Sequence, residues 1–217
     1  MENTFVNNDF ADVLLNRQSI RHFDPKVIID RQEITEMLEQ TTTAPSACNL
    51  QAWKFIVVDN QEGKDKLKPL FLPFNYPQLD TCSAMIIIFA DSLAFHAYRD
   101  LWNAAYESGK ITAEKRDEVL KTFLPLYEAA PQEMLVIDAQ RDASLAAMQL
   151  MLIARGHGYD TNPIAGYQSS KLAALYDLDP KRYIPCMAIA IGKADQSKEN
   201  LELQSIRYDI DKVIDFV

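Results

Sequence analysis

The sequence predicts a fold that mixes helices and strands, with helices in the majority. Three short apolar segments, at 53–58, 84–90 and 184–191, have the length and the β-branched or aromatic content of core strands. The segment 132–155 is apolar around most of a helical circumference, which predicts a long buried helix. No repeat or linker-like run divides the chain, and 48% of its residues are hydrophobic, so we expect one domain over residues 1–217.

Shorter elements are expected between these segments. Asp30 followed by Glu33 resembles a capping box, which predicts that a helix begins there. Pro69, Pro73 and Pro77 predict a loop after residue 70. One further helix is expected to begin near residues 8–10. Others are expected at 63–70, at 92–130 with a break near 108–109, and at 169–176, and residues 159–164 are expected to be extended.

Charge and missing motifs exclude several classes of protein. The formal net charge of −9 argues against nucleic-acid binding, which requires a basic face. No apolar run approaches the ~20 residues of a membrane helix, and no signal peptide is visible, so we expect a cytoplasmic protein without membrane partners. The cysteines and histidines lack metal-site spacing, so no metal is expected. The motifs GxGxxG, GxxxxGK[ST] and GxSxG are absent.

A first polar cluster lies at residues 17–23. If the chain is extended after the first helix, Ser19 and Arg21 share one face, and Arg17 at the helix end can turn toward the same point. Two guanidinium groups and a hydroxyl suit a phosphate. The alternative is a solvated basic helix end, and the heptapeptide alone favours that alternative.

A second cluster is the loop of small and amide side chains at 43–52, which leads directly into an aromatic strand. Such a loop can approach a planar heteroaromatic ring closely. Asn49 and Gln51 can each donate and accept hydrogen bonds. A simple polar turn before a strand explains the loop about equally well.

Two further segments carry weaker signals. At 162–167, Pro163 and Gly166 shape a turn whose backbone N–H groups could face a ligand, such as the reducible edge of a flavin. Near the C-terminus, Arg207 could add a cation to a phosphate site. Most such turns are purely structural, and most terminal arginines are surface residues.

In this order, the four clusters resemble the FMN-dependent nitroreductase family, particularly its smaller NAD(P)H-dependent bacterial members. The resemblance runs from Phe10 to the tail. Segment 44–53 is similar to the family's most distinctive loop, with Ala52 where proline is more usual. Segment 158–166 is similar to its flavin-edge segment.

The resemblance implies an α+β fold with three layers, α/β/α, around a central, mostly antiparallel sheet flanked by helices. It also implies an intertwined homodimer with the helix 132–155 at its core. We expect the tail, from about 201 to 217, to pack on the partner subunit. Two FMN sites would lie at the interface, each built by both chains.

The same resemblance implies roles for individual residues. Arg17, Ser19 and Arg207 would hold the FMN phosphate, and Arg21 would approach the carbonyl groups of the isoalloxazine ring. The partner subunit would contribute Pro45, Ser46, Ala47 and Asn49. The implied FMN-binding residues are Arg17, Gln18, Ser19, Arg21, Pro45, Ser46, Ala47, Asn49, Gln51, Asn75, Gln78, Pro163, Ile164, Ala165, Gly166, Ser205 and Arg207.

Two positions depart from the family pattern. Ala165 stands where some members carry a glutamate that helps to seat the nicotinamide. Ser205 replaces a basic residue of some relatives, so the phosphate would have one cation fewer.

The implied activity is an FMN-dependent oxidoreductase with NADH or NADPH as co-substrate. It would reduce nitroaromatics, quinones or similar small acceptors by a ping-pong cycle. No catalytic acid or base side chain is implied, and Arg21 would offset negative charge on the reduced flavin. The alternatives are another family reaction such as reductive dehalogenation, a redox-sensing flavoprotein without useful turnover, and a helical dimerisation protein without cofactor.

Overall fold

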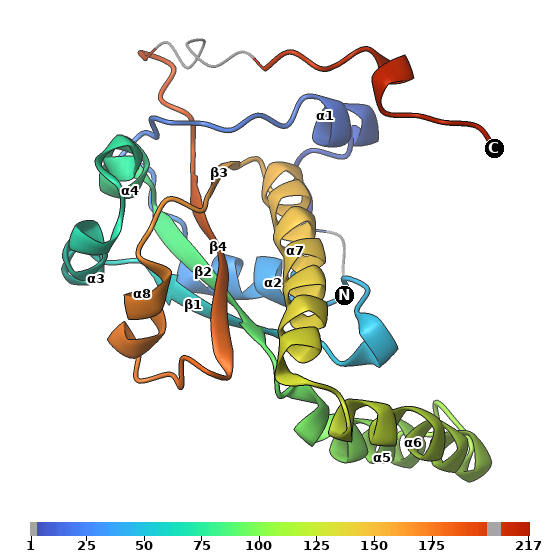
Figure 1. Ribbon diagram of the computed structural model, residues 1–217. Coiled ribbons are helices and arrows are strands. Elements are labelled where there is room, and N and C mark those ends of the chain that lie inside the picture. Colours follow the sequence, from blue (N-terminus) through green and yellow to red (C-terminus); the bar gives the residue numbers. More distant parts are fainter. Residues whose placement is uncertain (1–3, 199–204) are drawn as a thin grey trace.

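The computed structural model describes residues 4–198 and 205–217, which build a four-stranded sheet between two layers of helices (Figure 1). The strands are β1 (Trp53–Val58), β2 (Ala84–Asp91), β3 (Asp160–Ile164) and β4 (Tyr183–Gly192). Their order is β1-β2-β4-β3, and every neighbouring pair is antiparallel. The three strands expected from the sequence are confirmed, and the extended segment at 159–164 is the edge strand β3.

Helices surround this sheet and extend beyond it. They are α1 (Phe10–Leu15), α2 (Arg31–Thr41), α3 (Gln61–Leu67), α4 (Tyr76–Thr81), α5 (Tyr98–Glu107), α6 (Ala113–Glu128), α7 (Gln132–Gly156) and α8 (Ser169–Leu175). Among the described residues, none of these helices is both long and apolar enough to cross a membrane.

The alternation of side chains along β2 produces the layers. Ile86 and Ile88 point into the core that α2 and α7 cover. Ile87 and Phe89 point to the opposite face, which α3, α4 and α8 cover. Because successive residues of a strand face opposite sides, an unbroken apolar run requires helices on both faces. The three-layer α+β architecture is therefore confirmed.

Side-chain caps begin several helices. Asp9, Asp30 and Thr112 accept hydrogen bonds from backbone N–H groups in the first turns of α1, α2 and α6. The helix expected to begin at Asp30 is confirmed, with Asp30 as its N-cap, but the capping box is incomplete. Asp30 accepts from the Gln32 N–H, whereas the Glu33 carboxylate accepts from the Tyr159 hydroxyl at 2.8 Å.

The proline-rich stretch is more ordered than expected. The loop predicted after residue 70 contains α4, with Pro77 in its first turn. Proline is tolerated there because the first N–H groups of a helix have no intrahelical acceptor. The break near residues 108–109 is confirmed: Gly109 has φ of 72° between α5 and α6.

One side of α7 is covered by the rest of its own chain and one side is not. Ala143 and Leu150 are fully buried against the sheet. Leu145 and Met148 are 48% and 39% exposed. The expectation that most of this helix is buried is therefore wrong within one chain. We call the exposed apolar residues of this helix the α7 stripe; they are Met134, Ile137, Leu145 and Met148.

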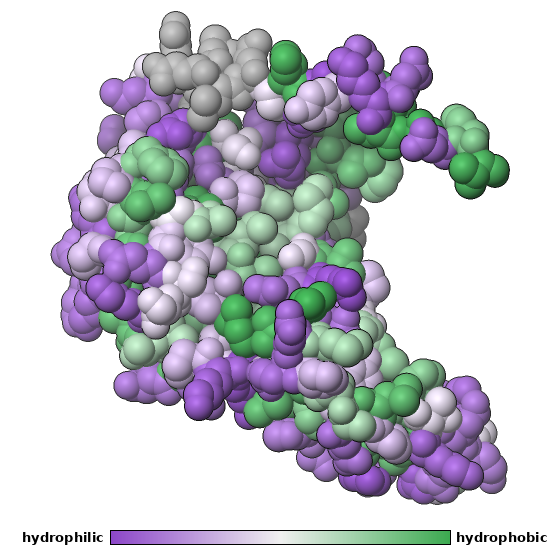
Figure 2. All heavy atoms as spheres, viewed as in Figure 1, coloured by the Kyte–Doolittle hydropathy of each residue, from purple (hydrophilic) through white to green (hydrophobic). Residues whose placement is uncertain are grey.

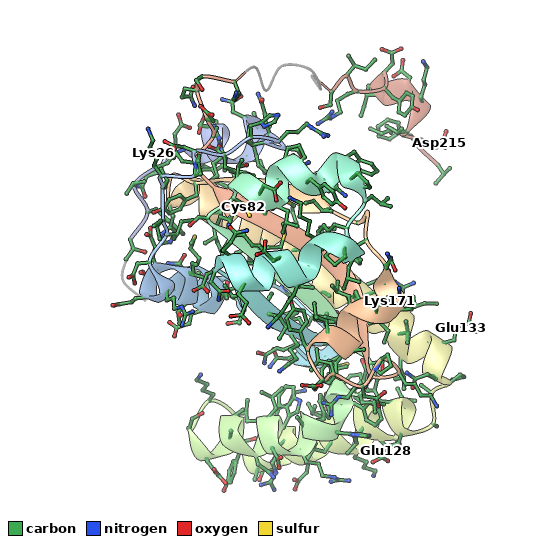
Figure 3. All side chains as sticks on the ribbon, turned by 90° about the vertical axis from the view of Figure 1, so that its left-hand side faces the viewer. Lys26, Cys82, Glu128, Glu133, Lys171 and Asp215 are labelled. Atoms are coloured by element: carbon green, nitrogen blue, oxygen red, sulfur yellow. The ribbon has the colours of Figure 1, made fainter. Side chains whose placement is uncertain are left out.

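Two parts of the chain project from the body. The α5–α6 hairpin, which ends at Glu128, lies at one end of the molecule, and the C-terminal segment with Asp215 lies at the other (Figure 3). Figure 2 shows the molecule hollowed between them on one side, with hydrophobic residues along part of the rim. The C-terminal segment is exposed throughout residues 205–217 and carries large apolar side chains such as Ile206 and Phe216.

Asp12 is expected to make stability depend on acid pH. Its carboxylate accepts hydrogen bonds from Asn16, Arg155 and Asn7, which lower its pKa from 3.8 to about 2. The bond from Asn16 lowers the pKa most. A carboxyl group with a depressed folded pKa stabilises the protein above its unfolded pKa and loses that contribution as pH falls through the folded value.

We therefore expect Asp12→Asn to lower the free energy of unfolding at neutral pH. The difference from wild type should shrink as pH falls from 3.8 to about 2. Urea denaturation at a series of pH values measures this. A difference in the free energy of unfolding that stays constant as pH falls to about 2 would contradict the stabilising role of the Asp12 carboxylate.

Candidate functional site

The segment after α1 lies along the free edge of β3. Ser19 forms a parallel β-bridge with Thr161, and the Ile20 N–H donates to the Thr161 carbonyl at 3.0 Å. The Asn162 side chain returns a hydrogen bond to the Ile20 carbonyl at 2.9 Å. These bonds fix residues 19 and 20 beside the edge strand and leave Ser19 exposed.

Three buried polar atoms in this region have no hydrogen-bond partner among the described residues. They are Nη1 of Arg17, Oε1 of Gln78 and Oγ1 of Thr161. A guanidinium group keeps its charge, so a buried N–H without an acceptor is costly. Such atoms indicate a missing polar partner. Arg17 beside the edge strand therefore fits an anionic group supplied from outside the chain.

Several residues that the resemblance placed near the flavin ring are joined to one another by hydrogen bonds. Arg21 Nη2 donates to the carbonyl of Phe74 at 2.6 Å. Asn75, in the same loop, donates through Nδ2 to the carbonyl of Gly166 at 3.1 Å, and the Leu72 N–H donates to that carbonyl at 2.9 Å. The structure thus joins three predicted segments through hydrogen bonds: residues 17–21, the loop before α4 and the turn after β3.

Gly166 is the point of closest approach in this cluster. A Cβ added there would lie 2.5 Å from Asn75 Nδ2 and 3.1 Å from Cζ of Phe74. We expect Gly166→Ala to displace the Asn75 amide and to destabilise the protein by about 1–3 kcal/mol, the usual cost of overpacking.

Chemical denaturation of a double-mutant cycle tests this. In an Asn75→Ala background the main obstacle is gone, so Gly166→Ala should cost clearly less. Equal costs in both backgrounds would show that the two residues are not coupled.

The loop between α2 and β1 has an unusual backbone. Cys48, Asn49 and Gln51 have φ of 50°, 58° and 50°. Non-glycine residues adopt this left-handed region only when the surroundings hold them there, and such positions cluster at functional sites. Two hydrogen bonds hold the loop. Within it, Ser46 Oγ accepts from the Gln51 N–H at 3.0 Å, and from α7 the Asp142 carboxylate accepts from the Ala47 N–H at 2.9 Å.

The predicted site residues are not all brought together within one chain. In Figure 1 the loop that leads into β1 lies on the opposite side of α7 from the segment between β3 and α8. Arg207 donates to Ser205 Oγ at 2.7 Å, within the exposed C-terminal segment. The predicted residues with exposed side chains are Gln18, Ser19, Pro45, Asn49, Ala165, Ser205 and Arg207. Half-buried or buried are Arg17, Arg21, Ser46, Ala47, Gln51, Asn75, Gln78, Pro163, Ile164 and Gly166.

The sequence interpretation missed two residues. Thr161 lies inside the segment that was recognised, but only the strand register shows that its hydroxyl is buried beside Ser19. Asp142 left one signal, which is a carboxylate in the middle of an otherwise apolar helix. That signal becomes informative only when the fold places the helix against the loop.

Comparison with known proteins identifies the family. The sequence pattern described as Nitroreductase family matches residues 14–193. The chain belongs to this family. It is therefore an oxidoreductase of the nitroreductase fold. It is 50% identical over 212 residues to the CLA biosynthesis enone reductase of Lactiplantibacillus plantarum, covering 98% of this chain and 96% of that protein.

Two further relatives are similar along most of their length. YdgI of Bacillus subtilis, a proposed NAD(P)H nitroreductase, is 43% identical over 187 residues, which cover 86% of this chain and 89% of that protein. A solved structure of a proposed nitroreductase from Exiguobacterium sibiricum, in complex with FMN, superimposes with a TM-score of 0.91 at 38% identity, covering 97% of this chain and 98% of the other.

Proposed function

We propose that this chain binds FMN and uses NADH or NADPH to reduce nitroaromatics, quinones or similar small organic acceptors. The observation that carries the proposal is the buried Nη1 of Arg17, which lacks a partner among the described residues beside the edge strand. Support also comes from the solved relative that is described in complex with FMN. When bound, FMN supplies the redox chemistry by taking electrons from the nicotinamide and passing them to the acceptor. The two substrates occupy the site in turn, as in a ping-pong cycle.

The side chains bind and orient rather than act as acids or bases. Arg17 and Ser19 bind the phosphate through charge-assisted and hydroxyl hydrogen bonds. Arg21 is held by the Phe74 carbonyl, which fixes its positive charge near the position that the resemblance gives to the ring. A fixed cation there stabilises negative charge without reorganisation. Asn75 and the Gly166 carbonyl define the wall beside it.

The complete site needs a second copy of the chain. Within one chain the loop that leads into β1 and the segment between β3 and α8 lie on opposite sides of α7 (Figure 1). The α7 stripe is apolar and exposed, as expected of a helix whose other face is covered by a partner. We propose a homodimer with this stripe at its centre, in which each loop 45–51 completes the site of the partner and each C-terminal segment packs on it.

A second acceptor class is favoured by one relative. The 50% identity with a protein named as an enone reductase extends over 98% of this chain. We therefore propose α,β-unsaturated ketones as alternative acceptors, which would accept electrons at the carbon–carbon double bond.

A comparison of acceptors tests the proposed function. The FMN-loaded protein is mixed anaerobically with NADPH or NADH and with a nitroaromatic, a benzoquinone or an enone, and kcat/KM is measured for each. A saturated ketone is the matched control for the enone. Turnover of the nitroaromatic and the benzoquinone supports the main proposal. A clearly higher kcat/KM for the enone supports the proposal of enone acceptors. Bound FMN without turnover of any acceptor would contradict both and favour a redox-sensing flavoprotein.

A further inference from the structure

Asp142 is a buried charge whose position packing does not explain. It lies near the middle of α7 and is 3% exposed, among buried alanines such as Ala139, Ala143 and Ala146. Within residues 4–198 and 205–217 no cation forms an ion pair with it. Burial raises the pKa of its carboxyl group, which reflects the cost of keeping a charge in this environment. An alanine or leucine would pack there without that cost.

The Asp142 carboxylate is bonded to a distant loop. Oδ1 accepts a hydrogen bond from the Ala47 N–H at 2.9 Å, across 95 residues of sequence. This bond favours the charged form of the carboxyl group, and its second oxygen, Oδ2, is buried without a hydrogen-bond partner among the described residues. One side chain on α7 thus fixes the start of the loop at 47–52, and the other end of the loop continues into β1 at Trp53.

The segment that follows this anchor point at Ala47 is the strained one. Cys48, Asn49 and Gln51 lie in the left-handed region, which costs about 1 kcal/mol or more per residue and persists only under constraint. Cys48 packs inward against the aromatic cluster of Tyr98 and Tyr127, at the base of the α5–α6 hairpin. Asn49 remains exposed. The anchored loop therefore keeps Asn49 exposed on its outer surface while Cys48 on its inner side is half-buried.

We propose that Asp142 is a positioning residue, which holds the backbone of residues 47–51 in the conformation that contacts FMN in the partner subunit. This inference rests on the proposed function, because that function makes the loop part of the flavin site. Asp142 is buried in α7, so its effect on FMN binding is transmitted through its hydrogen bond to the loop backbone.

The test separates positioning from stability. Asp142→Leu removes the acceptor and fills the site with an apolar side chain of the same branching, so the removal of a buried charge offsets the loss of the Ala47 bond and the variant should fold. We expect its FMN dissociation constant to rise at least about tenfold, since the bond that fixes the start of the loop to α7 is lost. The Ala47 amide should lose its protection from hydrogen exchange, in the absence of FMN as well. Asp142→Asn keeps a carbonyl oxygen as acceptor and should bind FMN within about threefold of wild type.

Ser83→Ala is the matched control. Ser83 Oγ accepts from the Ile29 N–H at 2.7 Å, a comparable long-range bond that holds a different loop. Its loss should leave FMN binding unchanged. If Asp142→Leu does not fold, Asp142→Ala replaces it in the same comparison with Asp142→Asn.

The outcomes distinguish this inference from the function on which it rests. Wild-type affinity and wild-type exchange at Ala47 in Asp142→Leu would overturn the positioning role and leave the flavin site standing. A wild-type protein that binds no FMN would overturn both proposals. A tenfold loss in Asp142→Leu that Asp142→Asn restores would support the positioning role.

Discussion

The Leu145→Asp substitution is expected to give a folded monomer that does not retain FMN. Leu145 is 48% exposed in the single chain and belongs to the α7 stripe, which is the proposed centre of the dimer. In a twofold interface the same residue occurs twice, so one substitution places two like charges in an apolar contact. Each charge left buried and unpaired costs several kcal/mol, enough to shift the equilibrium to monomers at micromolar concentration.

The effect on FMN follows from the position of the loop at 45–51. If this loop completes the site of the partner, a monomer lacks the contacts that the partner's loop provides. Sedimentation velocity gives the mass, and absorbance at the flavin bands after gel filtration gives the FMN content. The control is Ile28→Asp, because Ile28 is 85% exposed and lies outside α7. A Leu145→Asp protein that stays dimeric with full FMN content would contradict the proposed interface.

The Arg17→Ala substitution is expected to weaken FMN binding about 10- to 100-fold. Hydrogen bonds to charged groups contribute about 1.5–3 kcal/mol, and each 1.4 kcal/mol corresponds to a factor of ten. Arg17 is the predicted phosphate ligand whose Nη1 is already buried without an acceptor among the described residues, so binding costs it little further desolvation. Arg17→Lys keeps the charge but loses the planar fork, and an intermediate loss is expected.

Riboflavin is the matched ligand for this test because it lacks the phosphate. Quenching of flavin fluorescence in titrations of the apoprotein gives both affinities. Arg17→Ala should bind riboflavin like wild type while its affinity for FMN falls. Equal losses for the two ligands would show that Arg17 acts on the ring or on the fold and not on the phosphate.

Much of the fold could be predicted because side-chain patterns report burial directly. The unbroken apolar run of β2 requires cover on both faces, and the structure provides α2 and α7 on one face and α3, α4 and α8 on the other. The same patterns do not show whether an apolar face is covered by the same chain or by a partner subunit. Leu145 looks like a core residue in sequence, yet the chain itself leaves it half exposed.

The residues of the candidate site could be proposed from the sequence, but their arrangement could not. Arg17, Ser19 and Arg21 were proposed as phosphate or ring ligands because the ordered clusters resemble the family. The left-handed backbone at Cys48 was not, because no glycine marks it and tertiary contacts impose it. Asp142 shows the same limit, since its role depends on a loop 95 positions away in sequence.

The most direct test of the central claim is the visible spectrum of the FMN-reconstituted protein before and after anaerobic addition of NADH or NADPH. The proposed function predicts bound-flavin bands that bleach on addition and return when a nitroaromatic, a quinone or an enone is added. Bands that persist with both nicotinamides, or a protein that shows no flavin bands after incubation with FMN, would contradict it.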